Sequence, residues 1–505
     1  MLREVRVKNG VVRGLPAADP RITSFKGIPF AAPPTGKNRW RAPQSAADWD
    51  GVLEAFQFGP IAMQATPGVN KDNIYDFEWH VDPNVPMSED CLYLNVWTPA
   101  ISANEKLPVF VWYFGGGLQV GYPSEMEFDG ERLSRRGIVV VTINYRLNVF
   151  GFLSHPEITA EAPDAPANFG HLDQQFATRW VQENIAAFGG DPLNITIGGQ
   201  SAGGGSVLSQ LTSPQNEGLC QRAIIQSGIF APVYPSNRVP PAKRMLEAAE
   251  QEGVKFFDYL GVSSLAEARA LDGETIRLKA LEYKRFWGTV QDGAFCTGDP
   301  FQLFLENERL MVPVLMGHTS SEFVSAPRVS SKEELQALAS EMFGEKAEEF
   351  LELCDFASGD LEEILDRAAI NTIEYGIRLA GRANARTGAN VPLYYYNFAA
   401  DIPGPDNPGT FHSVDLWFFF ETLAKCWRPF VGKHYDLARQ MCNYWANFIA
   451  DGDPNGEDVP GQKMEQWDVY TEDEPFGMVF GEWPDFSKEE PGALMEFMIE
   501  HYFHK

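Results

Sequence analysis

The chain has 505 residues, 44% of them hydrophobic, and its 41 basic and 69 acidic residues give a formal net charge of −28. This charge repels nucleic acid and anionic membrane surfaces, so we expect neither as a partner. No run of 18 apolar residues occurs, and the N-terminal MLREVRVKNGVVRG lacks the apolar core of a signal peptide. We therefore predict a cytoplasmic protein without a membrane span. The six scattered cysteines include no CxxC pair, which argues against a disulfide framework or zinc site.

The first hundred residues predict a hairpin, a loop and a strand. Residues 5–13, with Asn9-Gly10 at their centre, predict a short hairpin at the edge of a sheet. Residues 25–34 are rich in proline and aromatic side chains and predict a surface loop over a cleft, either as a cleft wall or as ordinary packing. Residues 88–99 alternate leucine and valine with polar residues, which predicts a strand.

Further along, short apolar strands alternate with helical patterns. Residues 172–188 carry apolar side chains at helical spacing and end at a Gly-Gly-Asp-Pro breaker. The predicted strands are residues 107–114, 138–145, 195–197, 222–226, 313–317 and 393–398. This alternation predicts an α/β fold with a mostly parallel, twisted sheet.

Two helix-rich stretches, residues 241–284 and 331–389, are longer than ordinary connections between strands. We interpret them as insertions that cap the C-terminal edge of the sheet, where α/β proteins bind ligands, although packing alone would also explain them. Without a repeat or a low-complexity linker, residues 1–505 are interpreted as one domain.

The segment NITIGGQSAGGGS, Asn194 to Ser206, holds a Gly-x-Ser-x-Gly pentapeptide centred on Ser201. A β-branched run precedes it and a helical pattern follows, which is the context of a nucleophile elbow. Ser201 is therefore the candidate nucleophile, with an ordinary glycine-rich turn as the alternative. A phosphate-binding loop is excluded because the required Lys-Ser/Thr is absent. Three glycines, Gly115 to Gly117, end an earlier strand and offer backbone N–H groups to an oxyanion, or form a flexible turn.

A serine nucleophile needs a histidine base and a carboxylate that orients it. In α/β-hydrolases both follow the serine, in the order acid then histidine. His412 is the preferred base because it lies in a loop after a predicted strand, whereas His318, His434, His501 and His504 are less suitable. Glu322, just past another strand, is the preferred acid, and Asp299, Asp401 and Asp406 remain alternatives.

With these residues and motifs, the chain resembles the carboxylesterase type B family, the cholinesterase-like α/β-hydrolases, and a bacterial-type member in particular. The matching segments are FKGIPFAAPP, SEDCLYLNVWTP, VWYFGGGL, VVVTINYRLNVFGFLS, FGGDPLNITIGGQSAGG, VPVLMGHTSSEF, FHSVDLWFFF and YWANFIADGDPNG.

The resemblance implies an α/β-hydrolase fold and a serine esterase that needs no cofactor or metal. It implies Ser201 as nucleophile, Glu322 as acid and His412 as base. The implied oxyanion donors are the N–H groups of Gly116, Gly117 and Ala202. The expected partner is a small-molecule ester, and the oligomeric state is not predicted. Cleavage of amide, carbamate or lactone bonds is an alternative, as is a non-catalytic interaction protein.

The chain departs from the family at several positions. Gln200 replaces the usual glutamate before the serine, which removes a negative charge beside the nucleophile and alters the preference for cationic substrates. Phe114 replaces a histidine, and Ser321 and Phe323 flank the acid in place of Asp and Gly. Cys91 has no upstream cysteine partner. The predicted lining of the substrate pocket is Phe30, Gln200, Phe230, Trp287, Trp417 and Phe418.

Overall fold

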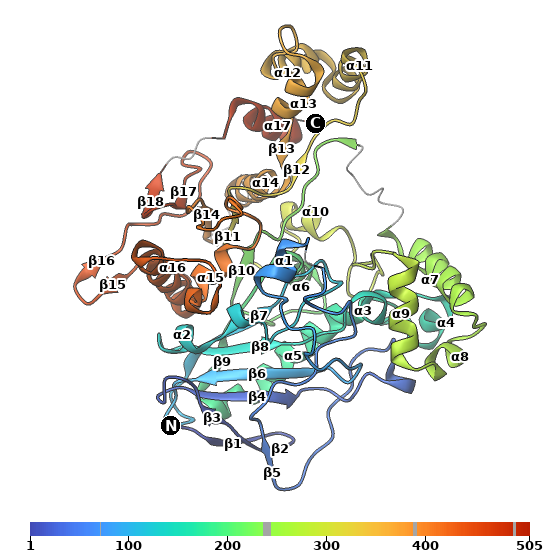
Figure 1. Cartoon of the computed structure of the whole chain (residues 1–505), viewed down its shortest axis with the longest axis vertical. Coiled ribbons are helices and arrows are strands. Elements are labelled where there is room, and N and C mark those ends of the chain that lie inside the picture. Colours follow the sequence, from blue (N-terminus) through green and yellow to red (C-terminus); the bar gives the residue numbers. More distant parts are fainter. Residues whose placement is uncertain (71, 236–243, 387–390, 488–490, 505) are drawn as a thin grey trace.

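A large twisted sheet organises the chain in the computed structural model, which describes residues 1–70, 72–235, 244–386, 391–487 and 491–504 (Figure 1). Among these residues the sheet has 11 strands. In spatial order they are β18 (Pro484–Ser487), β17 (Gly477–Phe480), β14 (Leu393–Phe398), β11 (Val314–Thr319), β10 (Arg222–Gln226), β9 (Gly190–Gln200), β7 (Leu107–Tyr113), β8 (Val139–Ile143), β6 (Tyr93–Thr98), β4 (Thr23–Pro29) and β3 (Leu15–Pro16).

The seven neighbouring strands from β17 to β8 are all parallel, whereas β18, β6, β4 and β3 pair antiparallel at the two edges. Parallel strands covered on both faces are apolar along their whole length. In β9, for example, Ile195 and Ile197 are fully buried. The predicted α/β fold with a mostly parallel sheet is confirmed.

Helices cover this sheet next to the strands that carry the candidate site. Helix α5 (Phe169–Asn184) and helix α6 (Ala202–Thr212) contact each other and strand β9. Helix α16 (Gly432–Asp451) contacts β7 and β9, with α15 (Asp415–Phe419) beside it. The predicted helix at 172–188 is thus α5 continued by a 3-10 turn at Ile185–Phe188.

The N-terminal region differs from the prediction in two ways. The hairpin forms as β1 (Glu4–Val7) and β2 (Gly10–Arg13), but it joins β5 (Val52–Glu54) in a separate three-stranded sheet. The predicted loop at 25–34 is wrong for its first half, because residues 25–29 belong to strand β4, where Phe25 and Ile28 are fully buried. Gly27, with a φ of +75°, lies in a bulge that lets the strand continue through this glycine- and proline-containing sequence.

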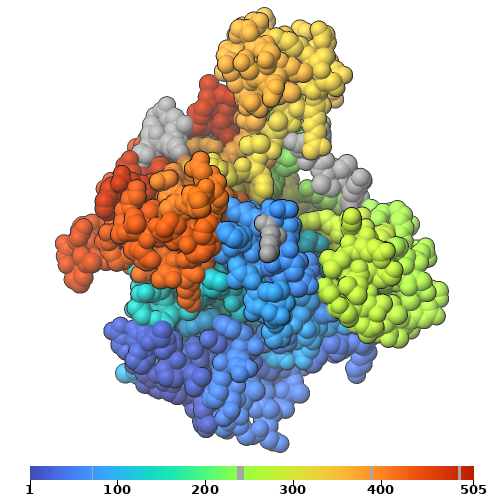
Figure 2. Space-filling view, viewed as in Figure 1, coloured from blue at the N-terminus to red at the C-terminus, as the bar shows by residue number. Residues whose placement is uncertain are grey.

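The two helix-rich stretches lie in different parts of the molecule (Figure 1). The first contains α7 (Leu246–Leu260), α8 (Leu265–Ala270) and α9 (Gly273–Tyr283). The second contains α11 (Lys332–Phe343), α12 (Ala347–Leu353), α13 (Leu361–Arg367) and α14 (Thr372–Arg386). Figure 2 shows α11 to α13 as a lobe that projects from the body. Residues 241–243 and 387–389 of the predicted insertions lie outside the described residues, and a capping role remains a prediction.

Two further observations concern the whole described chain. None of the helices in its described ranges is long and apolar enough to cross a membrane. All six cysteines are free thiols, and all but Cys426 are buried.

Candidate active site

Ser201 occupies a strained turn between β9 and α6. Its backbone has φ 55° and ψ −127°, outside the regions that non-glycine residues ordinarily adopt. The turn closes only with small neighbours. A Cβ on Gly199 would lie 2.4 Å from the backbone of Gly203, and a Cβ on Gly203 would lie 2.1 Å from the carbonyl oxygen of Tyr113. The strand, serine and helix of the predicted nucleophile elbow are therefore present.

Glu322 and His412 lie in loops that follow the neighbouring parallel strands β11 and β14. His412 Nδ1 is 2.5 Å from Glu322 Oε2. The two loops are tied together by a backbone bridge between Ser321 and Phe411. Because parallel strands end at the same edge of a sheet, residues 90 positions apart meet here.

The second oxygen of Glu322 is saturated with hydrogen-bond donors. Oε1 accepts from Ser227 Oγ at 2.6 Å, from Thr319 N at 3.1 Å and from Thr319 Oγ1 at 3.0 Å. Burial by itself would raise the pKa of Glu322, but the charge and hydrogen bond of His412 and the other donors outweigh it and lower the pKa. The carboxylate is thus ionised at neutral pH, and it places the imidazole hydrogen on Nδ1 of His412.

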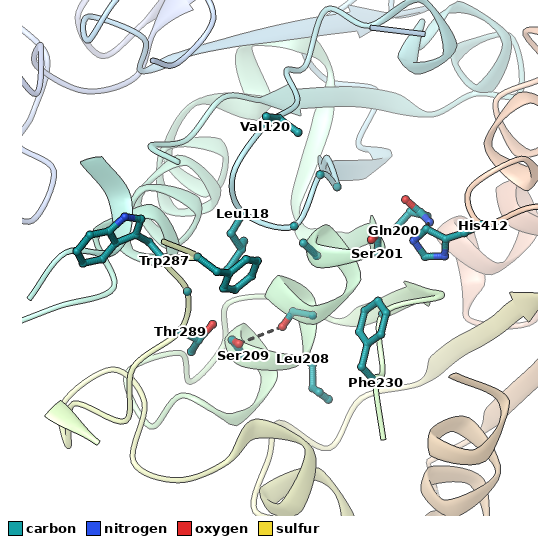
Figure 3. A pocket seen from close by; sticks show the side chains of 18 of the residues that line it. Leu118, Val120, Gln200, Ser201, Leu208, Ser209, Phe230, Trp287, Thr289 and His412 are labelled. Carbon is teal, nitrogen blue, oxygen red and sulfur yellow. Dashed lines mark hydrogen bonds between the residues drawn. The ribbon is translucent and has the colours of Figure 1, made fainter. Parts of the chain in front are cut away.

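The other ring nitrogen of His412 faces Gln200, which is itself 2% exposed. The Gln200 amide nitrogen lies 3.3 Å from His412 Nε2 and 2.6 Å from Ser413 Oγ. Since Glu322 keeps the hydrogen on Nδ1, Nε2 is the acceptor and the amide donates to it. Gln200, Ser201 and His412 cluster at one side of the pocket in Figure 3.

Backbone N–H groups suited to an oxyanion surround the same space. Gly116 and Gly117 follow β7 with φ values of +107° and +64°, and a Cβ on Gly116 would lie 2.1 Å from the carbonyl oxygen of Val120. Ala202 is the first residue of α6, so its N–H has no partner within the helix and lies at the positive end of the helix dipole. All three residues line the cavity that also contains Ser201 and His412.

This cavity has a volume of about 1700 Å³. Of the predicted pocket residues, Gln200, Phe230 and Trp287 line it, as Figure 3 shows. Phe230 is 45% exposed and approaches the His412 ring with a centroid distance of 6.2 Å. A water-accessible cleft with apolar walls and a few polar groups is the usual form of a small-molecule site.

The other three predicted pocket residues are corrected by the structure, because Phe30, Trp417 and Phe418 lie in the hydrophobic core with 0–1% of their surface exposed. The Trp417 indole N–H donates to the buried Glu78 carboxylate. Phe418 packs on Phe398 at a centroid distance of 4.8 Å. Aromatic content alone does not distinguish a pocket wall from a core, since both are apolar.

The alternative acids and bases have other partners. His318 Nε2 lies 2.8 Å from the Tyr395 hydroxyl, and His434 lies in the first turn of α16. Asp299 caps helix α10 (Pro300–Leu305), and Asp406 accepts from Arg428. The structure thus brings Glu322, and none of these, to His412.

A second buried carboxylate near the pair was not predicted from the sequence. Asp415 is fully buried, and its Oδ2 accepts from the Tyr396 hydroxyl at 2.8 Å and from Gln226 Nε2 at 3.1 Å. Burial, with the nearby charge of Glu322, raises the pKa of Asp415 from 3.8 to about 6, although the two hydrogen bonds oppose this. The only feature of the sequence that indicates a place for Asp415 near this pair is its position three residues after His412.

The parallel sheet, the serine elbow and the carboxylate–histidine pair at neighbouring strand ends define the class of serine hydrolases with an α/β-hydrolase fold. The model of the Carboxylesterase family matches residues 2–353 and 362–488. The chain therefore belongs to the Carboxylesterase family.

Individual relatives agree with this assignment. The chain is 32% identical to an acetylcholinesterase of Bungarus fasciatus, over 94% of this chain and 82% of that protein. It is 30% identical to a fumonisin B1 esterase of Sphingopyxis macrogoltabida, over 89% of this chain and 82% of the relative. Among solved structures, a carboxylesterase of Geobacillus stearothermophilus superposes with a TM-score of 0.77 at 30% identity, covering 98% of this chain and 99% of that one.

Proposed function

We propose that this chain hydrolyses small-molecule carboxylic esters through an acyl-enzyme on Ser201, with His412 as the base and Glu322 as its carboxylate partner. The oxyanion donors in this proposal are the N–H groups of Gly116, Gly117 and Ala202. Membership of the Carboxylesterase family supports ester hydrolysis. The observation that carries the residue roles is the 2.5 Å contact between His412 Nδ1 and Glu322 Oε2, at the wall of the cavity that Ser201 lines.

Acylation begins when Ser201 Oγ attacks the ester carbonyl carbon and His412 Nε2 takes the hydroxyl proton. The carbonyl oxygen becomes an oxyanion, which accepts hydrogen bonds from the backbone N–H groups. Glu322 stays ionised and stabilises the imidazolium. Collapse of the tetrahedral intermediate breaks the bond to the alcohol oxygen, which receives the proton from His412 and leaves as the alcohol.

Deacylation repeats these steps with water. His412 takes a proton from water as the water oxygen attacks the acyl carbon, and returns it to Ser201 Oγ when the carboxylic acid leaves. Gln200 donates to the ring nitrogen that accepts these protons, so this contact must be given up when the ring is protonated, whereas the 2.6 Å hydrogen bond from Gln200 to Ser413 Oγ can remain. The reaction needs no group beyond the chain, the ester and water.

The proposal is tested by comparing the wild type with Ser201→Ala on p-nitrophenyl acetate and butyrate. We expect kcat to fall by about 10⁶, because the nucleophile and its base act as a unit. A thermal unfolding midpoint equal to that of the wild type would show that the variant is folded. A folded Ser201→Ala variant with turnover within tenfold of the wild type would contradict the proposed nucleophile.

A further inference from the structure

Helix α6 forms one wall of the cavity from the elbow outward. Ser201, Gly205, Leu208 and Ser209 all line the cavity, because residues four and seven or eight apart share a face of a helix. At 1.5 Å of rise per residue, Ser209 lies about 12 Å from Ser201 along this wall. Gly205 leaves the wall open midway, since it has no side chain.

Two hydroxyl groups lie at the far end of this wall. Ser209 Oγ donates to the carbonyl oxygen of Gly205 at 3.0 Å, the bond drawn dashed in Figure 3. Thr289 also lines the cavity, and its Oγ1 lies 2.8 Å from Nε2 of His171, a buried ring at the cavity wall. Figure 3 shows Thr289 and Ser209 on the same side of the pocket, away from His412.

The other hydrogen bonds of His171 determine whether its Nε2 or the Thr289 hydroxyl is the donor in the contact between them. Gln174 Nε2 donates to Ser206 Oγ at 2.9 Å, so its oxygen is the atom 3.0 Å from His171 Nδ1. An amide oxygen only accepts, and Nδ1 therefore carries the hydrogen. Burial lowers the pKa of His171 to about 4, which leaves the ring neutral at pH 7. Nε2 is then an acceptor, and Thr289 must donate to it.

Both hydroxyl hydrogens are therefore already used, by Gly205 and by His171. A hydroxyl oxygen has two lone pairs as well as its hydrogen, so Ser209 and Thr289 each keep acceptor capacity toward the cavity. The matching ligand group is a hydrogen-bond donor. An acyl chain that ends in a methyl group would offer the lone pairs of these oxygens no donor, at a cost in affinity.

The mechanism decides which half of an ester reaches this end. The leaving alcohol takes its proton from His412, so the alcohol half lies on the His412 side of Ser201. The acyl half then points the other way, along α6 toward Trp287, Thr289 and Ser209, which Figure 3 places on the opposite side of Ser201 from His412.

We propose, on the basis of the proposed function, that Ser209 and Thr289 form a subsite for a hydroxyl or N–H group at the far end of the acyl chain. The donor would stand on the order of ten covalent bonds from the ester carbonyl, because each bond of an extended chain spans little more than ~1.2 Å of the 12 Å wall. The preferred substrates are esters of medium-chain acids with a terminal hydrogen-bond donor.

The test compares a p-nitrophenyl ester of a medium-chain ω-hydroxy acid with its isostere, in which a terminal methyl replaces the hydroxyl. We expect the wild type to have a kcat/KM ratio that favours the hydroxy ester by about tenfold, the value of one net hydrogen bond. Ser209→Ala and Thr289→Val should each reduce this ratio severalfold. The matched control is Ser340→Ala, because Ser340 is an exposed helical serine that also donates to the carbonyl four residues earlier, that of Gln336.

The outcomes separate this inference from the proposed function. An unchanged ratio in both variants, or a wild type without preference while p-nitrophenyl acetate is still hydrolysed, would overturn the subsite and leave the esterase proposal intact. No hydrolysis of any ester by folded wild-type protein would overturn the proposed function and the subsite with it. A ratio that falls in both variants and not in Ser340→Ala supports the subsite.

Discussion

The two ends of the cavity use hydrogen bonds in opposite ways. At the His412 end an ionised carboxylate is surrounded by donors, and both carboxylate oxygens of Glu322 have partners within the protein. At the far end the groups are neutral, and Ser209 and Thr289 keep acceptor capacity toward the cavity. The first arrangement fixes the position of a reacting group, as preorganised catalysis requires. The second is incomplete until a ligand supplies a donor.

The difference implies that substitutions at the two ends affect different quantities. Changes at the His412 end should lower kcat for every ester, because they alter chemistry that all substrates share. Changes at the far end should alter the ranking of substrates, because they affect a contact that only some substrates make.

Among the substitutions that compare the two ends, Glu322→Gln has the largest expected effect. The amide keeps the size of the side chain but cannot stabilise an imidazolium, and it does not hold the ring in the required tautomer. We expect kcat for short and long esters to fall alike, by about 10⁴. Steady-state rates with p-nitrophenyl acetate and the long ester check this. A loss that differs strongly between the two esters would break the separation between the two ends.

The next effect concerns stability. The folded-state pKa of Asp415 is about 6, above its ordinary 3.8. The protonated carboxyl therefore contributes to the free energy of unfolding in full below pH 3.8, and this contribution is lost as the pH rises through 6. Asn cannot lose a proton. Relative to the wild type, Asp415→Asn should therefore gain up to about 3 kcal/mol in free energy of unfolding between pH 4 and pH 7. Urea unfolding at both pH values measures this, and a difference that is constant with pH would contradict it.

Gly205→Leu should shorten the far end. A Cβ at Gly205 would meet its nearest atom, the Gly228 carbonyl oxygen, at an ordinary 3.5 Å, so the helix accepts a side chain there and the side chain occupies the cavity. We expect the kcat/KM ratio of the long to the acetyl ester to fall between about 10-fold and 100-fold, the range of an overpacked contact. Gly432→Leu, at an exposed glycine, is the control. An equal loss for both esters would mean that α6 does not line the acyl path.

The smallest expected effect is that of Gln200→Glu, which places a carboxylate beside Ser201 on the alcohol side. The kcat/KM ratio of acetylthiocholine to its uncharged isostere should rise by about tenfold, which corresponds to a partly screened charge interaction. Gln336→Glu, on the exposed side of α11, controls for net charge. A ratio that does not change would contradict the role given to residue 200 in selecting against cations.

The sequence predicted most of the sheet, and it singled out Ser201 and His412, which line one cavity, and Glu322, which contacts His412. The apolar runs of β7, β8, β10 and β14 are buried from Val109, Val139, Ala223 and Leu393 onward, and burial on both faces leaves a clear pattern. The elbow was equally readable because its Gly-x-Ser-x-Gly pattern is local in the sequence, although the contact that requires Gly203 comes from Tyr113 on β7. Cytoplasmic location and the absence of a nucleic-acid partner stay predictions from composition.

What the sequence did not predict depends on contacts between distant residues. Phe230 lines the cavity, whereas three other aromatic residues of the same kind, Phe30, Trp417 and Phe418, lie in the core. The difference comes from the elements that pack against them, which the sequence around each residue does not indicate. Strand β4 was missed because its glycine and proline signal a loop, whereas its pairing with β6 overrides that preference. The partners Thr289 and His171 are 118 residues apart, so no local pattern joins them.

The most direct test of Ser201 as the nucleophile is to label the native protein with a fluorescent organophosphonate and to map the adduct by mass spectrometry. An activated serine beside its base should be phosphonylated rapidly. We expect a single adduct on Ser201, absent from Ser201→Ala and formed much more slowly in Glu322→Gln. An adduct on another residue, or no adduct on folded wild-type protein, would contradict the assignment of Ser201 as the nucleophile.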